Sequence, residues 1–273
     1  MNFLDHIPLG LVMLMSVLIQ VLFIEIGFRY GKTKQGKPYK AQMAQVRAIM
    51  GASLGLLAFM LAFSFSMAQQ HFEQRTQAYM MEVSAIDSAY RGADLIGTEQ
   101  QLQARELLRH FAKLRLQTTQ AAREADIDAV VEMIRESERI HDMLWALAEG
   151  AMEGAGDHED TGIFAQSVLA MINAHDARLQ AALFNRISPI IWLTLFLMAL
   201  LSMIVMGYQA GLTGTRSSLA TWTLAITFSA VMTLITDLDR PNMTLFEMNQ
   251  GLMVELENRM EGNESWSPQA QKR

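Results

Sequence analysis

The sequence RYGKTKQGKPYKAQMAQVR, residues 29–47, separates two long apolar runs near the beginning of the chain. It contains six Lys or Arg residues and no acidic residue, and the flanking runs cover residues 8–28 and 48–68. Each run has about the 20 residues that a helix needs to cross a hydrocarbon core of roughly 30 Å. Short basic loops between spans stay on the cytoplasmic side of a membrane. The sequence therefore predicts an integral membrane protein in which residues 1–68 form a transmembrane hairpin with a cytoplasmic loop.

The composition excludes several classes of protein. The 273 residues are 51% hydrophobic and 18% charged, and their uneven distribution does not fit a single soluble domain. The chain has no cysteine, which excludes disulfides, thiolate catalysis and cysteine-based metal sites. Its formal net charge is −6, and residues 69–186 alone hold 11 basic and 19 acidic side chains. Acidic surfaces repel phosphate backbones, so we expect no nucleic-acid partner.

The second apolar run carries small residues at spacings of three and four. They are Gly51, Gly55, Ala58, Ala62 and Ser66. Such a stripe allows another transmembrane helix to approach closely, and the first two residues form a GxxxG pair. The pattern leaves three partners open: the first span, a later span, or the same helix in another subunit.

Residues 69–186 predict a soluble bundle of about four helices inserted between two transmembrane hairpins. No helix stop follows the second span, so we expect one long helix from about residue 48 to about residue 95. A capping-box pattern of Thr98 and Gln101 begins the next helix, 99–124. A third helix begins near residue 126, and a Gly- and acid-rich loop at 149–162 precedes a fourth at 163–186. Four such helices are enough to form a separate core.

Residues 187–236 predict a second transmembrane hairpin with spans at 187–208 and 219–236. With the first loop in the cytoplasm, the inserted bundle and both termini are expected on the extracytoplasmic side. The fourth span has a hydroxyl-rich side that contains Thr223, Thr227, Ser229, Thr233 and Thr236. Most such hydroxyls bond to the backbone of their own helix or to a neighbouring helix. The alternative is that they line a water-filled path.

The motif DLDRP, residues 237–241, follows the fourth span directly. Proline disfavours helical geometry in the residue before it, so we expect the helix to end at Arg240. Our main interpretation is a structural contact in which Arg240 bonds to carbonyls or carboxylates of the long helix. The alternative is a cation site formed by Asp237 and Asp239.

An amphipathic helix is expected after this motif, within residues 237–262, and a disordered tail at 263–273. The apolar positions of the helix repeat at every fourth residue: Met248, Leu252, Leu256 and Met260. This spacing predicts one face that docks on the soluble bundle.

Two further polar features could carry a function. Glu25 lies one turn before Arg29, which indicates an ion pair at the membrane interface or a charge that faces a pore or partner helix. The sequence NAHDAR, residues 173–178, places Asn173 and Asp176 on one helix face. We interpret this pair as a polar contact between helices, because adjacent His and Asp side chains point about 100° apart and suit a metal poorly.

The chain contains no recognisable catalytic, cofactor-binding or metal-binding motif. Walker loops, GxGxxG, GxSxG and HExxH are all missing, and the six histidines are scattered. We therefore expect a protein that is not an enzyme and that holds no cofactor or metal.

The order of several motifs resembles a bacterial bestrophin-like membrane family, otherwise described as a domain of unknown function. The resemblance rests on LAFSFSMA (61–68), EVSAIDSAY (82–90), NAHDAR, GYQAG (207–211) and above all DLDRP. It covers nearly the whole chain. The sequence departs from the family pattern where residues 242–244, Asn-Met-Thr, replace a glycine expected shortly after DLDRP. The resemblance implies a multi-pass protein of the bacterial inner membrane, a homo-oligomer, and kinship with anion channels whose aromatic-lined pore stretches are missing here.

Two functions remain open at this point. The first is an oligomeric ion channel or pore that handles a small inorganic ion. The second is a non-conducting sensor or scaffold whose outer bundle binds a ligand or an unidentified protein partner. The acidic exterior would concentrate cations near a pore mouth, which does not favour an anion channel.

Overall fold

The computed structural model describes residues 7–34, 40–124, 126–153, 158–214, 218–240 and 250–262. The described part contains helices and no strand. In chain order the elements are α1 (Leu9–Lys32), α2 (Lys40–Gly92), a 3-10 turn η2 (Ala93–Leu95), α3 (Thr98–Arg123), α4 (Ile127–Glu153), α5 (His158–Phe184), α6 (Pro189–Thr213), α7 (Ser218–Asp239) and α8 (Gly251–Glu261). The all-helical fold is as the sequence predicts.

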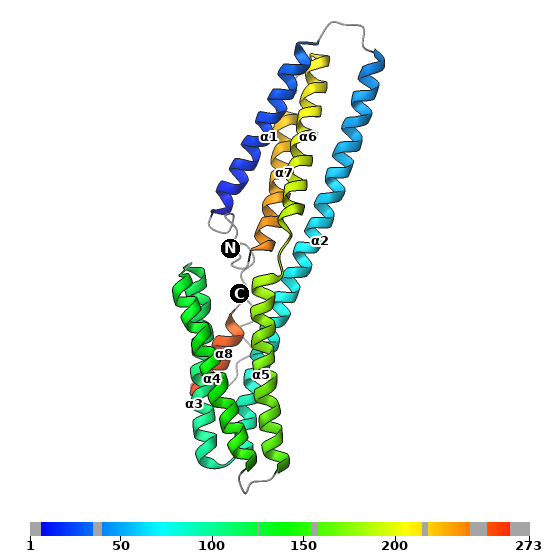
Figure 1. Ribbon diagram of the computed structural model, residues 1–273. Coiled ribbons are helices and arrows are strands. Elements are labelled where there is room, and N and C mark those ends of the chain that lie inside the picture. Colours follow the sequence, from blue (N-terminus) through cyan, green and yellow to red (C-terminus); the bar gives the residue numbers. More distant parts are fainter. Residues whose placement is uncertain are drawn as a thin grey trace. The chain divides into compact units, whose positions relative to one another are not determined.

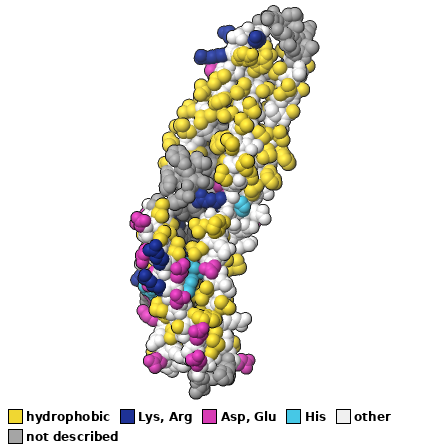
Figure 2. Space-filling model, in the orientation of Figure 1, with side chains coloured by type: hydrophobic (Ala, Val, Ile, Leu, Met, Phe, Trp, Pro, Cys, Tyr) yellow, Lys and Arg dark blue, Asp and Glu magenta, His cyan; other side chains and the backbone are white. Residues whose placement is uncertain are grey.

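The chain divides into two compact units. Unit 1 comprises residues 1–72 and 186–246, and unit 2 comprises residues 73–185 and 247–273. Four helices, α1, α2, α6 and α7, are long and apolar enough to cross a membrane. Figure 2 shows hydrophobic side chains over most of the visible face of unit 1, whereas charged side chains gather over unit 2. α2 begins within the predicted basic loop, at Lys40, and contributes residues to both units.

Unit 1 is organised by a close crossing of α1 and α6, which lie side by side in Figure 1. A Cβ added at Gly27 would lie 2.2 Å from the carbonyl oxygen of Ile204, and one added at Gly207 would lie 2.0 Å from that of Ile24. Gly31 and Gly211 make the same kind of approach one turn further along. Residue numbers rise together along both helices, so α1 and α6 are parallel. Only glycine permits backbones to come this close.

The small-residue stripe of α2 lies elsewhere. Gly51, Gly55, Ala58, Ala62 and Ser66 are all exposed, and a Cβ added at either glycine meets no atom within 4 Å. The opposite side of α2 packs against α6 and α7 through Leu57, Leu61 and Ala68. Among the described residues, neither the first span nor a later span packs on the stripe, which leaves the same helix in another subunit as the predicted partner.

Unit 2 is a bundle of the C-terminal part of α2 with α3, α4 and α5, and α8 packs on the same core. The predicted capping box is wrong: no side-chain hydrogen bond caps α3, and Gln101 donates its side chain to Asp94 at 2.7 Å. α8 buries Met253, Leu256 and Met260. Leu252, predicted to dock, is exposed, whereas Met248 lies outside the described residues. The helix therefore docks with a face rotated from the predicted one.

Candidate functional site

A cluster of charged side chains lies in the core of unit 2, at positions where the periodicity of each helix calls for apolar residues. Glu82 on α2 lies one turn from the buried residues Tyr79 and Ile86. On α5, Phe164, Val168 and Met171 form a buried face of the helix. His175 and Arg178 are the next residues on this face. Arg115 and His141 occupy equivalent core positions on α3 and α4. All four bundle helices thus contribute to one buried polar cluster.

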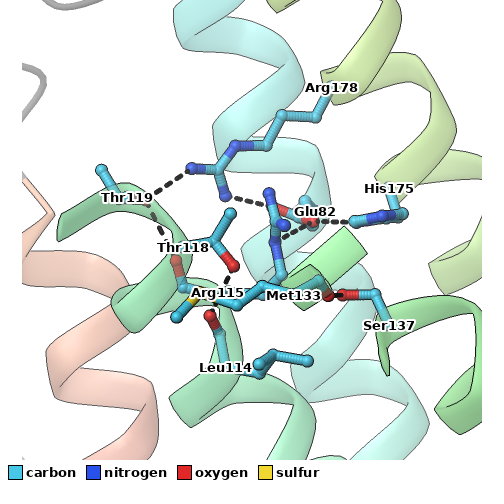
Figure 3. Close-up of polar contacts among 9 residues, drawn as sticks. All are labelled: Glu82, Leu114, Arg115, Thr118, Thr119, Met133, Ser137, His175 and Arg178. Carbon is cyan, nitrogen blue, oxygen red and sulfur yellow. Dashed lines mark hydrogen bonds and ion pairs between the residues drawn. The ribbon is translucent and has the colours of Figure 1, made fainter. Parts of the chain in front are cut away.

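Glu82 is the centre of the cluster (Figure 3). Its Oε1 atom lies 2.8 Å from Nδ1 of His175 and 3.0 Å from Nε of Arg115, and its Oε2 atom forms an ion pair with Arg178. Arg178 also reaches Thr119 on α3, with 3.4 Å between Nη2 and Oγ1. A carboxylate only accepts hydrogen bonds, so the proton between Glu82 and His175 belongs to the histidine. One carboxylate therefore holds α2, α3 and α5 together.

Aromatic contacts extend the cluster to α4. The rings of His141 and His175 meet edge to face with their centroids 4.9 Å apart. Phe111 contacts both, at centroid distances of 5.0 Å and 5.5 Å. His141 is therefore held between an apolar ring and a histidine that is itself fixed by Glu82.

Burial and charge determine the ionisation of the cluster. Burial on its own raises the pKa of Glu82, but the charge of Arg115, the hydrogen bond from His175 and the charge of Arg178 outweigh it and lower this pKa to about 2. Burial lowers the pKa of Arg115 to about 10, with Glu82 opposing the shift. Burial, and next the neighbouring His175, lower the pKa of His141 to about 4. At neutral pH, Glu82 and Arg115 are therefore charged and His141 is neutral.

Several nitrogen atoms of the cluster have no hydrogen-bond partner among the described residues. They are Nη1 of Arg115, Nε2 of His141 and Nε2 of His175. Nε of Arg115 has an ion-pair distance to Glu82 but not the angle of a hydrogen bond. Buried polar groups in folded proteins are almost always bonded, so these atoms require an explanation.

The described part of the DLDRP motif, residues 237–240, lies in unit 1 and is buried. Asp237, Asp239 and Arg240 are 0%, 7% and 5% exposed, and α7 ends at Asp239. Oδ1 of Asp239 accepts a hydrogen bond of 2.7 Å from the backbone N–H of Ile187, just before α6. This bond supports a structural role for the motif and connects it to α6.

Among the other predicted site residues, Glu25 and Thr233 make contacts within their own helices. Glu25 forms an ion pair of 2.9 Å with Arg29, whose side chain is 80% exposed. Asn173 and Asp176 are both exposed, so the members of NAHDAR that face the core are His175 and Arg178. Thr233 donates to the backbone oxygen of Ser229 in its own helix, at 2.7 Å.

A polar contact inside unit 1 was not anticipated from the sequence. Gln20 on α1 donates to Ser16 at 3.1 Å and to Ser229 on α7 at 2.9 Å, and Ser229 donates to Ser16 at 3.1 Å. Thr227, Thr233 and Thr236 bond to their own backbone. Ser229, in contrast, bonds to another helix and joins the first and fourth spans.

These features define an all-helical protein with four candidate membrane spans and a bundle that has a charged core. A family model described as the Bestrophin-like domain matches residues 16–242. The chain therefore belongs to the bestrophin-like family, as its motifs indicated. No curated protein and no solved structure gave a significant match.

Proposed function

We propose that this protein is an oligomeric ion channel whose pore lies between copies of the chain. The observation that carries the proposal is the uncovered small-residue stripe of α2, from Gly51 to Ser66, whose opposite side is already filled. A stripe of this kind accommodates a neighbouring transmembrane helix at short distance. In a symmetric oligomer, a second copy of the chain supplies such a helix at every interface.

Conduction between copies also fits the distribution of polar side chains. The interior of unit 1 contains a packed apolar cluster, and its polar side chains Gln20, Ser16 and Ser229 bond to one another. Thr223 and Thr227, in contrast, lie on the exposed side of α7. Hydroxyl oxygens on an outer face can line a path for ions when several copies form a ring. The family supports a channel-like role as well.

The proposed topology has a 2+2 arrangement of spans, with the bundle and both termini outside the cytoplasm. The basic loop supports this orientation. The parallel packing of α1 and α6 supports it too, because parallel spans require the chain to cross back between them, and α2 supplies that crossing. A reporter inserted at residue 154, between α4 and α5, is expected to be accessible from outside the cell. Cytoplasmic accessibility at this position would overturn the topology.

Reconstitution into liposomes tests conduction. Ion flux and subunit number are measured on the same purified sample, with Thr227→Val as the test variant and Thr233→Val as its matched control. Both threonines bond to their own backbone, but Thr227 is exposed and Thr233 is buried. We expect flux above that of empty liposomes and a change only in Thr227→Val. A defined oligomer without flux would overturn the proposal.

A groove in the bundle favours the second candidate, a non-conducting sensor. It has a volume of about 250 Å³ and lies among α2, η2, α3 and α8, lined by Asp87, Tyr90, Arg91, Asp94, Arg105, Leu256, Arg259 and Met260. Ligand pockets are usually about 300–1,000 Å³, so this groove suits only a small polar ligand. Absence of flux together with a ligand-induced rise in the melting temperature (Tm), abolished by Arg105→Gln, would favour this function.

A further inference from the structure

The core of the bundle buries more positive than negative charge. Arg115 is 4% exposed and the side chain of Arg178 is 12% exposed, whereas Glu82 is fully buried. In the described part of the chain, Glu82 is the only carboxylate within ion-pair distance of either arginine. The two guanidinium groups therefore share one carboxylate, and a net charge of one remains. An uncompensated buried charge is strongly unfavourable, which calls for a counter-ion.

The unpartnered nitrogen atoms lie around this excess charge. Nη1 of Arg115 is a hydrogen-bond donor in every state of the side chain. Nε2 of His141 becomes a donor in the tautomer with its hydrogen there. Nε2 of neutral His175 carries a lone pair instead, because the hydrogen of this ring is on Nδ1, beside Glu82. The contact between the two imidazole rings places both histidines beside each other, and His175 touches the same carboxylate oxygen as Arg115. Arg115 and His141, which carry the two donors, therefore belong to the same cluster around Glu82.

The chemistry of this region selects among small ligands. A metal cation is disfavoured by the two arginines, and the described residues hold no group of three or more His, Asp or Glu side chains suited to a metal. A water molecule could satisfy hydrogen bonds but would leave the net charge unchanged. A monovalent anion satisfies the donors and cancels the charge. Phe111 and Leu144, both fully buried, belong to the same core, so the ligand must be small and compact.

We propose that the bundle core binds one small monovalent inorganic anion of halide type, held by Arg115 together with His141. The site lies in unit 2 and uses none of the residues that we assign to the pore. It therefore does not depend on the proposed conduction. The anion would act as a structural counter-ion that stabilises the folded bundle.

The first test uses the full-length protein in detergent, with bromide as the probe. Tm is followed by tryptophan fluorescence while bromide replaces gluconate at constant ionic strength. We expect a saturable rise in Tm of about 2–4 °C, because a ligand that binds only the folded state stabilises it by mass action. The rise should be lost in Arg115→Gln and kept in Arg123→Gln, an exposed arginine of the same helix. Equal Tm values in bromide and gluconate would overturn the proposal.

If Arg115→Gln fails to fold, a second measurement on the unaltered protein still tests the proposal. Crystals grown in bromide are expected to give an anomalous scattering peak beside the guanidinium of Arg115. A peak at that position supports the site. Density for water without an anomalous signal would show that the core is hydrated and would overturn the proposal.

Discussion

The carboxylate of Asp239, the last residue of α7, accepts a hydrogen bond of 2.7 Å from the backbone N–H of Ile187, two residues before α6. α6 and α7 are joined through residues 214–217 at their other ends. The bond therefore closes the open end of this hairpin. Both residues are buried, so the hydrogen bond is shielded from water and the donor has no solvent alternative.

Replacing Asp239 tests this bond. Asp239→Ala is expected to destabilise the protein by about 1–3 kcal/mol, because it leaves a buried N–H without an acceptor. Asp239→Asn keeps an oxygen that can accept the hydrogen bond from Ile187, so this variant should lose less stability. Thermal unfolding in detergent measures both variants. Equal losses of stability in the two variants would show that Asp239 stabilises the protein through its charge and not through this hydrogen bond.

Substitution at the glycine crossing should separate α1 from α6. Gly207→Ala places a Cβ 2.0 Å from the carbonyl oxygen of Ile24, and backbone cannot move aside as a side chain can. We expect a loss of stability of about 1–3 kcal/mol or more. Gly55→Ala is the matched control, because its Cβ would meet no atom within 4 Å. Thermal unfolding of both variants in detergent is the measurement.

The control also reports on the oligomer. An unchanged Tm in Gly207→Ala would contradict the close approach of the first and third spans. A loss of subunits in Gly55→Ala, without unfolding of the monomer, would identify the α2 stripe as the contact between copies. Size determination in detergent distinguishes these outcomes.

Neutralising the carboxylate of Glu82 should lower the free energy of unfolding of the bundle. Glu82→Gln leaves two arginines in the core without their carboxylate, which is expected to cost about 3–5 kcal/mol. Glu138→Gln, an exposed residue on α4, serves as the control and should stay within about 0.5 kcal/mol. Urea unfolding monitored by tryptophan fluorescence gives both values. A small loss in Glu82→Gln would show that another group compensates the arginines.

The bundle should lose stability in acid in two stages. The pKa of His141 is lowered from 6.5 to about 4, so below pH 6.5 the unfolded chain takes up a proton that the folded chain refuses. Stability contributed by neutral His141 is therefore lost between pH 6.5 and about 4. The pKa of Glu82 is lowered from 4.5 to about 2, so its contribution is present above pH 4.5 and is lost as pH falls toward 2.

Variants at histidine separate the two stages. In His141→Gln, the dependence of Tm on pH between 6.5 and 4 should become shallower, while the loss below pH 4.5 persists. His110→Gln, a change at a half-exposed histidine, is the control and should leave the first stage intact. An unchanged slope in His141→Gln would contradict the neutral, buried state of this imidazole.

The helices could be predicted from the sequence because their signals are local. Apolar periodicity without a stop after residue 68 indicated one long helix, and α2 extends to Gly92. Hydropathy alone indicated four spans. The exact docking face of α8 could not be predicted, because Leu252 and Met253 are both apolar neighbours and only the tertiary contact selects Met253.

The charged cluster could not be assembled from the sequence because its members come from four separate helices. A usable signal was present nonetheless: Glu82, Arg115 and His175 each continue a run of buried apolar positions. A charged side chain in such a position must find a partner in the core. Within NAHDAR, extending the stripe from Met171 selects His175 and Arg178, whereas Asn173 and Asp176 fall on the exposed side.

The pairing of closely packed helices could not be predicted from the sequence. GxxxG pairs occur on α1 at Gly27 and Gly31, on α2 at Gly51 and Gly55, and on α6 at Gly207 and Gly211. A pair of glycines permits close packing but does not determine which helix packs against it. The structure pairs the first with the third and leaves the second uncovered.

The docking of α8 imposes an order on the biosynthesis of the protein. Met253, Leu256 and Met260 complete the bundle core, and the backbone N–H of Met253 donates to the hydroxyl of Tyr79 at 3.1 Å. These residues leave the ribosome after all four spans have been made. The bundle therefore cannot finish folding while the chain is still being inserted, and a premature stop before residue 251 would produce a protein with intact spans and an unfinished bundle core.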